Sequence, residues 1–320
     1  MHERKLLILG GSGFVGRSLC AQLVAREGGA ADGGITVPTR HLARARGLNT
    51  LPGVTLVAAD VHDDAQLRAL VRDCDAVVNL VAILHGSEAG FEHVHVELPR
   101  RLVAACRAAG VRRVVHVSAL GAAADAPSRY LRSKAAGEAV LQSAWLDLTL
   151  LRPSVMFGEA DRFLNLFARL QAAFPLVPLA GAHAKFQPVW VEDVAAAIAA
   201  CLDAPRTIGL TLECAGPRVY ELHELVKLAG RWSGHPRRVV GLPDGLARVQ
   251  AALLGLLPGE PLITGDNLDS MKVPNVASGR LPGLQSLGIA PKALEAVAPA
   301  YLGAAPNQSH LDHWRSLAHH

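Results

Sequence analysis

The chain has 320 residues, half of them hydrophobic and 19% charged, so it can build a packed core and is not expected to be disordered. Its formal net charge is only +4, and apolar residues interrupt its arginine-rich stretches, which argues against a nucleic-acid-binding protein. Its five cysteines are widely spaced and form no Cys-x-x-Cys pair, which predicts free thiols in a reducing compartment.

The first part of the chain alternates short apolar runs with helical patterns. Five or six consecutive, mostly apolar residues are typical of parallel strands buried on both faces. The predicted strands are Lys5–Leu9, Ile35–Thr39, Val54–Ala58, Ala76–Val81, Arg113–Ser118 and Leu148–Arg152. The predicted helices are Phe14–Arg26, Asp64–Arg72, Val94–Ala109 and Tyr130–Ser143. The alternation indicates an α/β fold: a Rossmann-type, doubly wound parallel sheet over residues 1–155.

Residues 156–320 are expected to form a smaller, mostly helical region that closes over the sheet and shapes a substrate site. Helices are predicted over Arg162–Phe174 and Val194–Leu202, and strands around Phe186–Val191 and Leu210–Cys214. We expect residues 186–215 to pack back on the Rossmann sheet.

A glycine-rich run follows the first predicted strand and opens the first predicted helix. Residues 10–16 read G-G-S-G-F-V-G, which places glycines at a G-x-x-G-x-x-G spacing. The first glycine permits a tight turn, the second lets backbone N–H groups approach a diphosphate, and the third lets helix and strand pack closely. The helix N-terminus adds unpaired donors and partial positive charge. The residues predicted to hold the dinucleotide here are Gly10, Gly13, Phe14, Val15 and Gly16.

The end of the second predicted strand bears on which dinucleotide is bound. An NAD site usually has an acidic residue there for the ribose 2′-hydroxyl, but this chain reads V-P-T-R over residues 37–40. Arg40 could pair instead with a 2′-phosphate, so NADP(H) is preferred and NAD(H) stays open. The further cofactor-contacting residues predicted at strand ends are Asp60, Val61, Asn79, Val81 and Ala82.

Candidate catalytic side chains follow the fifth predicted strand. Tyr130 and Lys134 are four residues apart, so they share one face of a helix. An ammonium group beside a phenol lowers the pKa of the phenol, so Tyr130 is a candidate general acid or base for a carbonyl or carbinol. Lys134 can also hold the nicotinamide ribose. Ser118, 12 residues before Tyr130, could hydrogen-bond the substrate oxygen.

With these residues, the chain resembles the short-chain dehydrogenase/reductase superfamily, in its extended or atypical, epimerase-like branch. The resemblance covers nearly the whole length and implies that Ser118, Tyr130 and Lys134 form the active site. It also implies that Asn79 supports the cofactor and that the backbone around Pro153 faces the nicotinamide.

A narrower likeness rests on four segments, residues 128–134, 157–165, 187–194 and 281–284. They are similar to the NADPH-carrying accessory subunit of mitochondrial respiratory complex I and its bacterial relatives, a group also linked to ubiquinone biosynthesis. That subunit is regarded as holding its nucleotide structurally, so an intact tyrosine and lysine do not establish turnover. One departure is His95, where related enzymes often carry asparagine, which weakens any inference of a sugar substrate.

Two functions of different classes therefore stay open. One is reversible hydride transfer between NADP(H) and the carbonyl or carbinol of a small molecule that is lipophilic or related to quinones. This enzymatic function is favoured. The other is a nucleotide-bound accessory or assembly protein of respiratory complex I or ubiquinone biosynthesis without turnover. The apolar run Leu246–Leu257 predicts a helix capping the substrate cleft or, alternatively, a lid that rests on a membrane or partner complex.

Location and metal content follow from what the sequence lacks. No run reaches the ~20 apolar residues that span a bilayer, so we expect a cytoplasmic protein, with attachment to the periphery of the inner membrane as an extension. The pairs His93/His95 and His310/His313 have no cluster of carboxylates or thiolates beside them, so no metal site is predicted.

Overall fold

A seven-stranded parallel sheet forms the centre of the molecule in the computed structural model, which describes residues 4–26, 34–254 and 263–303. Its strand order is β11-β6-β5-β4-β1-β2-β3. The strands are β1 (Leu6–Leu9), β2 (Ile35–Thr39), β3 (Val54–Ala58), β4 (Ala76–Asn79), β5 (Arg113–Val117), β6 (Asp147–Pro153) and β11 (Thr211–Cys214). The predicted Rossmann-type sheet is confirmed, and each predicted strand end lies within two residues of the observed one.

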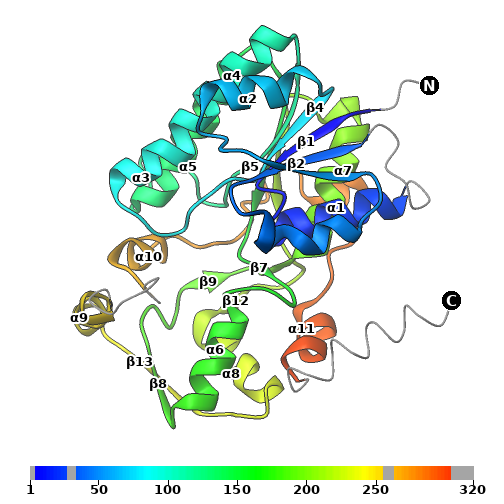
Figure 1. Ribbon diagram of the computed structural model, residues 1–320. Helices are drawn as coiled ribbons and strands as arrows, with labels where there is room; N and C mark the ends of the chain where they lie inside the picture. Colours follow the sequence, from blue (N-terminus) through cyan, green and yellow to red (C-terminus); the bar gives the residue numbers. More distant parts are fainter. Residues whose placement is uncertain (1–3, 27–33, 255–262, 304–320) are drawn as a thin grey trace, which may run out of the picture.

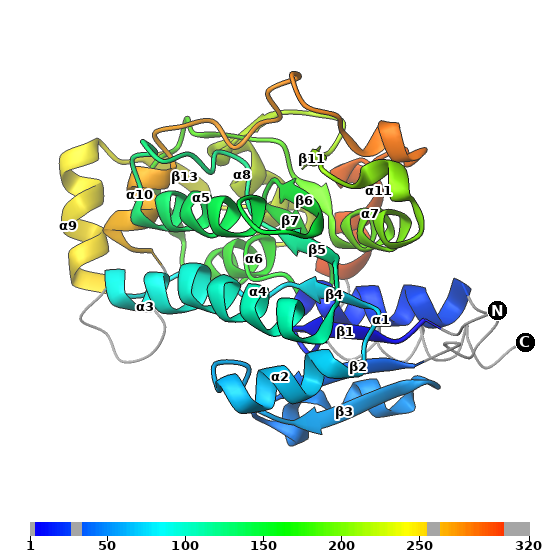
Figure 2. The ribbon, with the colours of Figure 1, turned by 90° about the horizontal axis from the view of Figure 1, so that it is seen from above.

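Helices cover both faces of this sheet because alternate residues of each strand point to opposite sides. On β1, Leu6 and Ile8 belong to a buried cluster with side chains of α1 (Phe14–Arg26) and α7 (Val191–Asp203). Leu7 and Leu9 belong to a second cluster. The helices of that second face are α2 (Asp64–Arg72), α4 (Leu98–Ala109) and α5 (Arg129–Gln142). Figure 2 shows the two helical layers on either side of the strands.

The helix predicted over Val94–Ala109 begins earlier and is built in three parts. Ser87 caps α3 (Glu88–Glu92), with its side chain accepting a hydrogen bond from the Gly90 amide. A π-helical turn, His93–Glu97, then leads into α4, which ends at Gly110 with a φ of +74°. The sequence pattern missed the first turns because the π turn shifts the periodicity that marks one continuous face.

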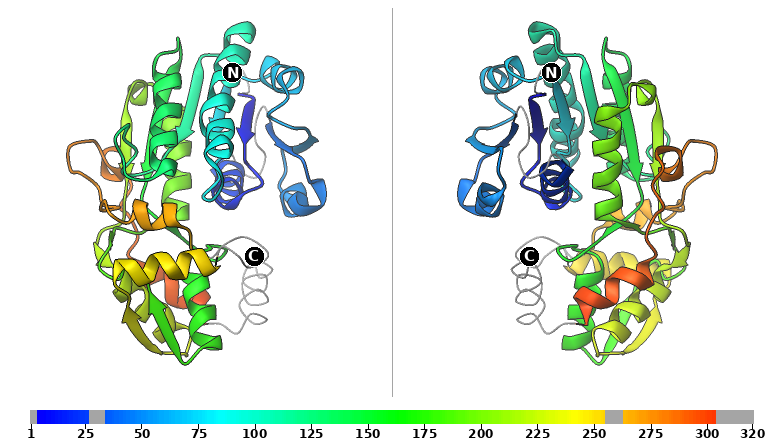
Figure 3. Two further views of the ribbon diagram at one scale, coloured as in Figure 1. Left: turned by 90° about the vertical axis from the view of Figure 1, so that its left-hand side faces the viewer. Right: turned by 90° about the vertical axis from the view of Figure 1, so that its right-hand side faces the viewer.

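The chain after β6, apart from α7 and β11, forms most of a second region that lies below the sheet in Figure 1 and as a separate lobe in both views of Figure 3. Its helices are α6 (Leu164–Ala173), α8 (Leu222–Trp232), α9 (Asp244–Leu254), α10 (Gly265–Ser270) and α11 (Leu294–Leu302). Its short strands are β7 (Met156–Phe157), β8 (Leu176–Leu179), β9 (Lys185–Phe186), β10 (Val189–Trp190), β12 (Tyr220–Glu221) and β13 (Arg238–Gly241). They pair as β10–β7, β12–β9 and β13–β8. Three 3₁₀ helices complete the described chain, at Leu42–Thr50, Pro205–Thr207 and Leu284–Leu287.

The sequence predicted one continuous strand around Phe186–Val191, and this prediction is wrong. The chain there forms β9 and β10, which pair with different partners on either side of Pro188. Proline has no N–H to donate to a ladder, so it interrupts strand pairing. Within the parts of the chain that the structure describes, no helix is both long and apolar enough to cross a bilayer.

Candidate functional site

The glycine run forms the turn between β1 and α1 at the point where the strand order reverses. Gly10 has a φ of +79°, and a Cβ there would lie 3.1 Å from the carbonyl carbon of Leu80, which follows β4. A Cβ on Gly16 would lie 2.4 Å from the Cα of Gly11, so only glycine fits where α1 meets the turn. β1 and β4 are neighbours in the sheet. Crevices at such switch points are where open α/β sheets bind ligands.

The first turn of α1 supplies donors at this point. The Arg17 amide donates to Gly13 O at 3.0 Å and closes the first turn. The amides of Phe14, Val15 and Gly16 precede it, so they have no acceptor within the helix. Gly13 is exposed, and these amides face the same edge of the sheet, where an anionic group fits.

The other predicted cofactor residues lie at strand ends along this edge. Arg40 directly follows β2 and is exposed. Asp60 and Val61 follow β3, and the Asp60 carboxylate accepts a hydrogen bond from the His62 amide at 3.0 Å. Buried Asn79 ends β4, and its side-chain oxygen accepts from the Val81 amide at 3.2 Å. Ala82 comes next and is exposed.

An arginine connects the glycine turn to the chain after β2. Arg17 Nε donates to Ser12 O at 3.0 Å, and its Nη2 donates to Arg44 O at 2.7 Å. The Arg17 guanidinium therefore holds the turn against the 3₁₀ helix that begins at Leu42. This arrangement places the positive charge of Arg17 next to the glycine turn, a link that the sequence motif did not predict.

Lys134 is buried beside the end of β5. Its Nζ donates to Val117 O at 2.9 Å, which places the ammonium group one residue from Ser118. Burial lowers the pKa of Lys134 to about 8, and the charge of Glu138 on the next turn of α5 opposes that shift. Ser118 is buried, and its hydroxyl has no hydrogen-bond partner among the described residues.

A buried ion pair and a strand end fix α5 against β6. Glu138 on α5 pairs with Arg152 on β6, and Arg152 Nε donates to Glu138 Oε1 at 2.9 Å. The next residue of β6, Pro153, is buried, and its carbonyl accepts from the Leu120 amide at 3.0 Å. The ends of β5 and β6 are thereby held together beside Lys134.

The pKa of the Tyr130 phenol differs from the value expected from the sequence. Burial raises its pKa to about 12, whereas we expected the ammonium of Lys134 to lower it. The reason is that Lys134 donates to Val117 O. The Tyr130 ring packs edge-on against His95 and Phe91, with ring centroids at 5.6 Å and 6.1 Å. The phenol is therefore neutral at ordinary pH in this state.

His95 connects the chain after β4 to α5. Its Nε2 accepts from the Ile83 amide at 3.1 Å, so its proton lies on Nδ1, which donates to Ser133 Oγ at 2.8 Å. The Ser133 hydroxyl in turn donates to Tyr130 O at 2.8 Å. Burial, with a contribution from the charge of Lys134, lowers the pKa of His95 to about 3. His95 is thus a neutral bridge between the chain after β4 and α5.

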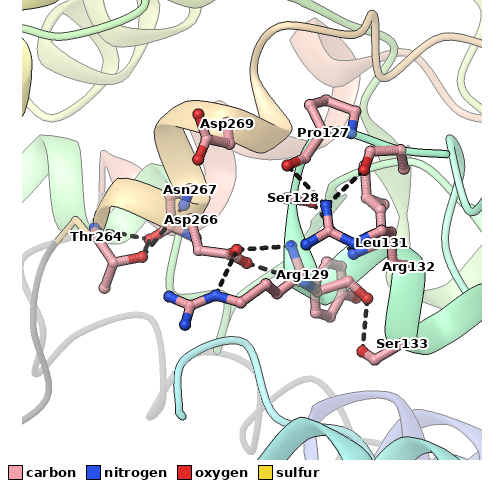
Figure 4. A network of polar contacts seen from close by, with 12 residues as sticks. Pro127, Ser128, Arg129, Leu131, Arg132, Ser133, Thr264, Asp266, Asn267 and Asp269 are labelled. Atoms are coloured by element: carbon pink, nitrogen blue, oxygen red, sulfur yellow. Dashed lines mark hydrogen bonds and ion pairs between the residues drawn. The ribbon is translucent and has the colours of Figure 1, made fainter. Parts of the chain in front are cut away.

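A carboxylate that sequence reasoning missed caps this helix from the second region. Asp266 on α10 accepts from the Arg129 amide at 2.7 Å and from the Tyr130 amide at 3.0 Å, as Figure 4 shows. Its Oδ1 also lies 3.5 Å from Arg129 Nε. The first turn of α5 carries no acidic residue of its own, so Asp266 supplies the negative charge that a helix N-terminus favours. The separation of 136 residues leaves no local signal for this contact.

The histidines considered as metal ligands in the sequence have other contacts. His93 Nδ1 lies 2.9 Å from Glu97 Oε2, and the His93 ring stacks on His62. His310 and His313 lie outside the described residues.

Comparison with known proteins agrees with this geometry. The family model for NAD(P)H-binding proteins matches residues 10–205. The chain is 34% identical over 298 residues to NADH dehydrogenase [ubiquinone] 1 alpha subcomplex subunit 9, mitochondrial, of Rattus norvegicus, covering 90% of this chain and 77% of that protein. It is 29% identical over 195 residues to a ceramide reductase of Caulobacter vibrioides, covering 60% of each chain.

Among solved structures, dTDP-glucose 4,6-dehydratase from Streptomyces venezuelae, with NAD and TYD bound, superimposes with a TM-score of 0.65 at 24% identity. The match covers 75% of this chain and 85% of that one and supports the fold. The fold and the glycine turn thus define an NAD(P)H-binding protein of Rossmann type. The chain belongs to the NAD(P)H-binding family and is a homologue of the complex I alpha subcomplex subunit 9.

Proposed function

We propose that this chain is an NADP(H)-dependent oxidoreductase that reduces or forms a carbonyl on a lipophilic small molecule. The observation that carries the proposal is the buried hydroxyl of Ser118, which has no hydrogen-bond partner in the described chain, beside the buried ammonium of Lys134. A buried donor without a partner costs free energy, so its retention calls for an explanation. A substrate oxygen would supply the missing partner.

The protonation state of Tyr130 suits the reductive direction. The bound reduced cofactor would supply hydride to the carbonyl carbon. Tyr130 is neutral, so its hydroxyl can donate the proton that the developing alkoxide requires. The phenolate left behind would take up a proton from water, and Lys134, with a pKa of about 8, would hold the nicotinamide ribose. Ser118 would orient the same substrate oxygen.

The preference for NADP(H) rests on charge at the end of β2. Arg40 is exposed there, no carboxylate accompanies it over residues 37–40, and Arg17 adds a second positive charge through its contact with Arg44 O. A guanidinium group can bind a 2′-phosphate with two hydrogen bonds. Arg40→Ala should therefore weaken NADPH binding and leave NADH binding nearly unchanged. Equal losses for the two nucleotides would contradict this role for Arg40.

A lipophilic substrate is supported by two observations. Leu246 and Val249 on α9 are 59% and 55% exposed, so an apolar stretch is open to solvent. One relative is named a ceramide reductase, an enzyme named for a lipid. The apolar run Leu246–Leu257 continues beyond the described part of α9, since residues 255–257 lie outside it. Liposome co-sedimentation of the chain, lost in a Leu246→Ser, Val249→Ser double variant, would support peripheral membrane contact; unaltered sedimentation of the variant would rule out this surface.

The alternative is a nucleotide-bound accessory protein of a respiratory complex without turnover. It is favoured by the similarity to a subunit of NADH dehydrogenase [ubiquinone] over 90% of this chain. In that case the same turn would hold the nucleotide as a structural part. Binding alone cannot separate the two functions, because both require a tightly held nucleotide.

The deciding experiment follows the absorbance of bound NADPH while purified protein is offered a panel of lipophilic ketones, aldehydes and quinones. We expect oxidation with at least one class, loss of turnover in Tyr130→Phe, and retained nucleotide affinity in that variant. Ser118→Ala should lower turnover with the same substrate. Turnover that survives in Tyr130→Phe would contradict the assigned proton donor, and a cofactor that stays reduced throughout the panel would favour the accessory function.

A further inference from the structure

Three side chains with metal-binding atoms converge in the second region, away from the nucleotide turn. Glu221 Oε2 lies 2.8 Å from His183 Nδ1 and 3.1 Å from His223 Nδ1. One ligand atom from each of the three side chains lies within 4.8 Å of the other two. Over the described ranges, this is the only group of three or more histidine, cysteine or acidic residues with such convergence. The cluster plays no part in the proposed oxidoreductase site.

The backbone holds these three positions in place without any ion. Glu221 ends β12, which pairs with β9 in an antiparallel ladder. Immediately after it, the Leu222 amide donates to Ala184 O at 2.9 Å and the His223 amide donates to Ala182 O at 3.0 Å. The two chain segments that carry the ligands are therefore fixed in register. A site on a rigid backbone loses less conformational entropy when it binds its ligand.

The ligand set indicates the class of ion. Two imidazole nitrogens and one carboxylate oxygen suit a borderline divalent transition metal such as Zn²⁺, whereas Mg²⁺ and Ca²⁺ prefer oxygen ligands alone. The His183 side chain is 86% exposed, so water can reach the cluster and complete a four-coordinate sphere.

Of the charges next to the cluster, one favours the binding of a cation and another opposes it. Glu224 on the first turn of α8 adds a negative charge, because its carboxylate accepts from the Glu221 amide at 2.8 Å. Lys185 pairs with Glu221 across the β9–β12 ladder, and its positive charge opposes the binding of a cation.

We propose that His183, Glu221 and His223 bind one divalent transition-metal ion, with Zn²⁺ as the reference, which ties the β9–β12 ladder to the first turn of α8. The ion would stabilise the second region, because ligands that bind only the folded state shift the unfolding equilibrium. It takes no part in hydride transfer.

The test is calorimetric titration of the full chain with ZnCl₂ near neutral pH, with MgCl₂ in parallel. We expect one saturable Zn²⁺ site and no comparable Mg²⁺ site. His183→Ala and His223→Ala should each weaken Zn²⁺ binding at least about tenfold, since losing even outer-shell partners costs metal sites that much. His183 is exposed, so its variant should fold normally. The control is His235→Ala, which removes an exposed histidine that contacts Ser233 O outside the cluster.

A second control separates metal binding from helix capping. Glu224→Gln weakens the capping interaction at Glu221 N without removing a ligand, so it should lower thermal stability yet keep the Zn²⁺-induced rise in Tm. His223→Ala should lose that rise. Zn²⁺ binding that is as strong in both histidine variants as in the wild type, or folded wild-type protein that binds no Zn²⁺, would overturn the proposal and leave the cluster as a set of hydrogen bonds. Neither result depends on whether the chain turns over NADPH.

Discussion

The glycine turn after β1 and the region beyond β6 are built in different ways. The turn is defined by backbone conformation within seven consecutive residues: a positive φ at Gly10, a close approach at Gly16, and free amides between them. In the second region, polar contacts join side chains to segments far away in the sequence, as Asp266 does at the α5 N-terminus. The comparison teaches that a sequence motif marks local backbone requirements, whereas contacts between distant segments leave no such mark.

The largest effect is expected where the backbone itself would clash. Gly16→Ala places a methyl group 2.4 Å from Gly11 Cα, and neither backbone can move without opening the turn. We expect a loss of about 3 kcal/mol in the free energy of unfolding, at the upper end of overpacking costs, together with loss of measurable NADPH binding. Urea denaturation and nucleotide fluorescence would measure both.

The control for that change is Gly47→Ala in the 3₁₀ helix after β2. A Cβ on Gly47 would meet no atom within 4 Å, so this change should leave stability within about 1 kcal/mol and binding intact. Similar losses in the two variants would show that the turn has no special backbone requirement.

A second change tests whether the second region can be weakened without affecting the turn. Gln171 on α6 is fully buried, and its Nε2 donates to Val226 O on α8 at 2.7 Å. Gln171→Ala removes this hydrogen bond and leaves the Arg237 amide without the acceptor that Gln171 Oε1 provides at 3.3 Å, so it should cost about 2 kcal/mol of unfolding free energy, with NADPH affinity nearly unchanged. Gln250→Ala, which removes an exposed amide at 3.3 Å from Pro178 O, is the matched control and should cost little.

The pH dependence of stability tests the contact that His95 makes between the chain after β4 and α5. Its pKa is about 3 in the folded chain, and an unfolded histidine has a pKa near 6.5. The unfolded state therefore binds the extra proton first, and stability falls as the pH drops from about 6.5 toward 3.

At pH ~5, this single group should account for about 2 kcal/mol of lost stability relative to neutral pH. In His95→Asn the decrease between neutral pH and that value should be smaller by this amount. His235→Asn, at an exposed position, should keep the wild-type dependence. Parallel curves for wild type and His95→Asn, from chemical denaturation across the range, would contradict the neutral, buried assignment.

The sequence predicted the sheet well because buried parallel strands are recognisable as apolar runs, and the glycine motif carries its own physical reasons. It placed Gly10, Arg40, Asn79 and Ser118 at strand ends along one edge, where the structure has them. The protonation of Tyr130 could not be predicted, because the direction in which Lys134 points depends on the position of Val117 O.

The second region was harder to predict because its strands contain only two to four residues and give no periodic signal. The convergence of His183 with Glu221 was also out of reach, because it depends on a ladder between segments that are 38 residues apart. The polar contacts of the second region can therefore be found only in the folded structure.

The smallest effect concerns the contact that joins the two regions. Asp266→Asn keeps the shape of the side chain on α10 but removes the charge that faces the amides of Arg129 and Tyr130. A charge at a helix N-terminus contributes up to ~1–2 kcal/mol when partly buried, so we expect about 1 kcal/mol of lost stability. If Asp266 also positions Tyr130, turnover should fall while the affinity for NADPH holds.

The matched control for this contact is Asp269→Asn on the same short helix. Asp269 pairs only with Arg248 and Lys272 among the described residues, at 3.0 Å and 2.7 Å, and such partly exposed pairs contribute about 0 to 1 kcal/mol. Equal, small effects of the two substitutions on turnover would mean that α10 merely covers α5. A loss of turnover confined to Asp266→Asn would mean that the second region sets the orientation of α5, the helix that carries Tyr130 and Lys134.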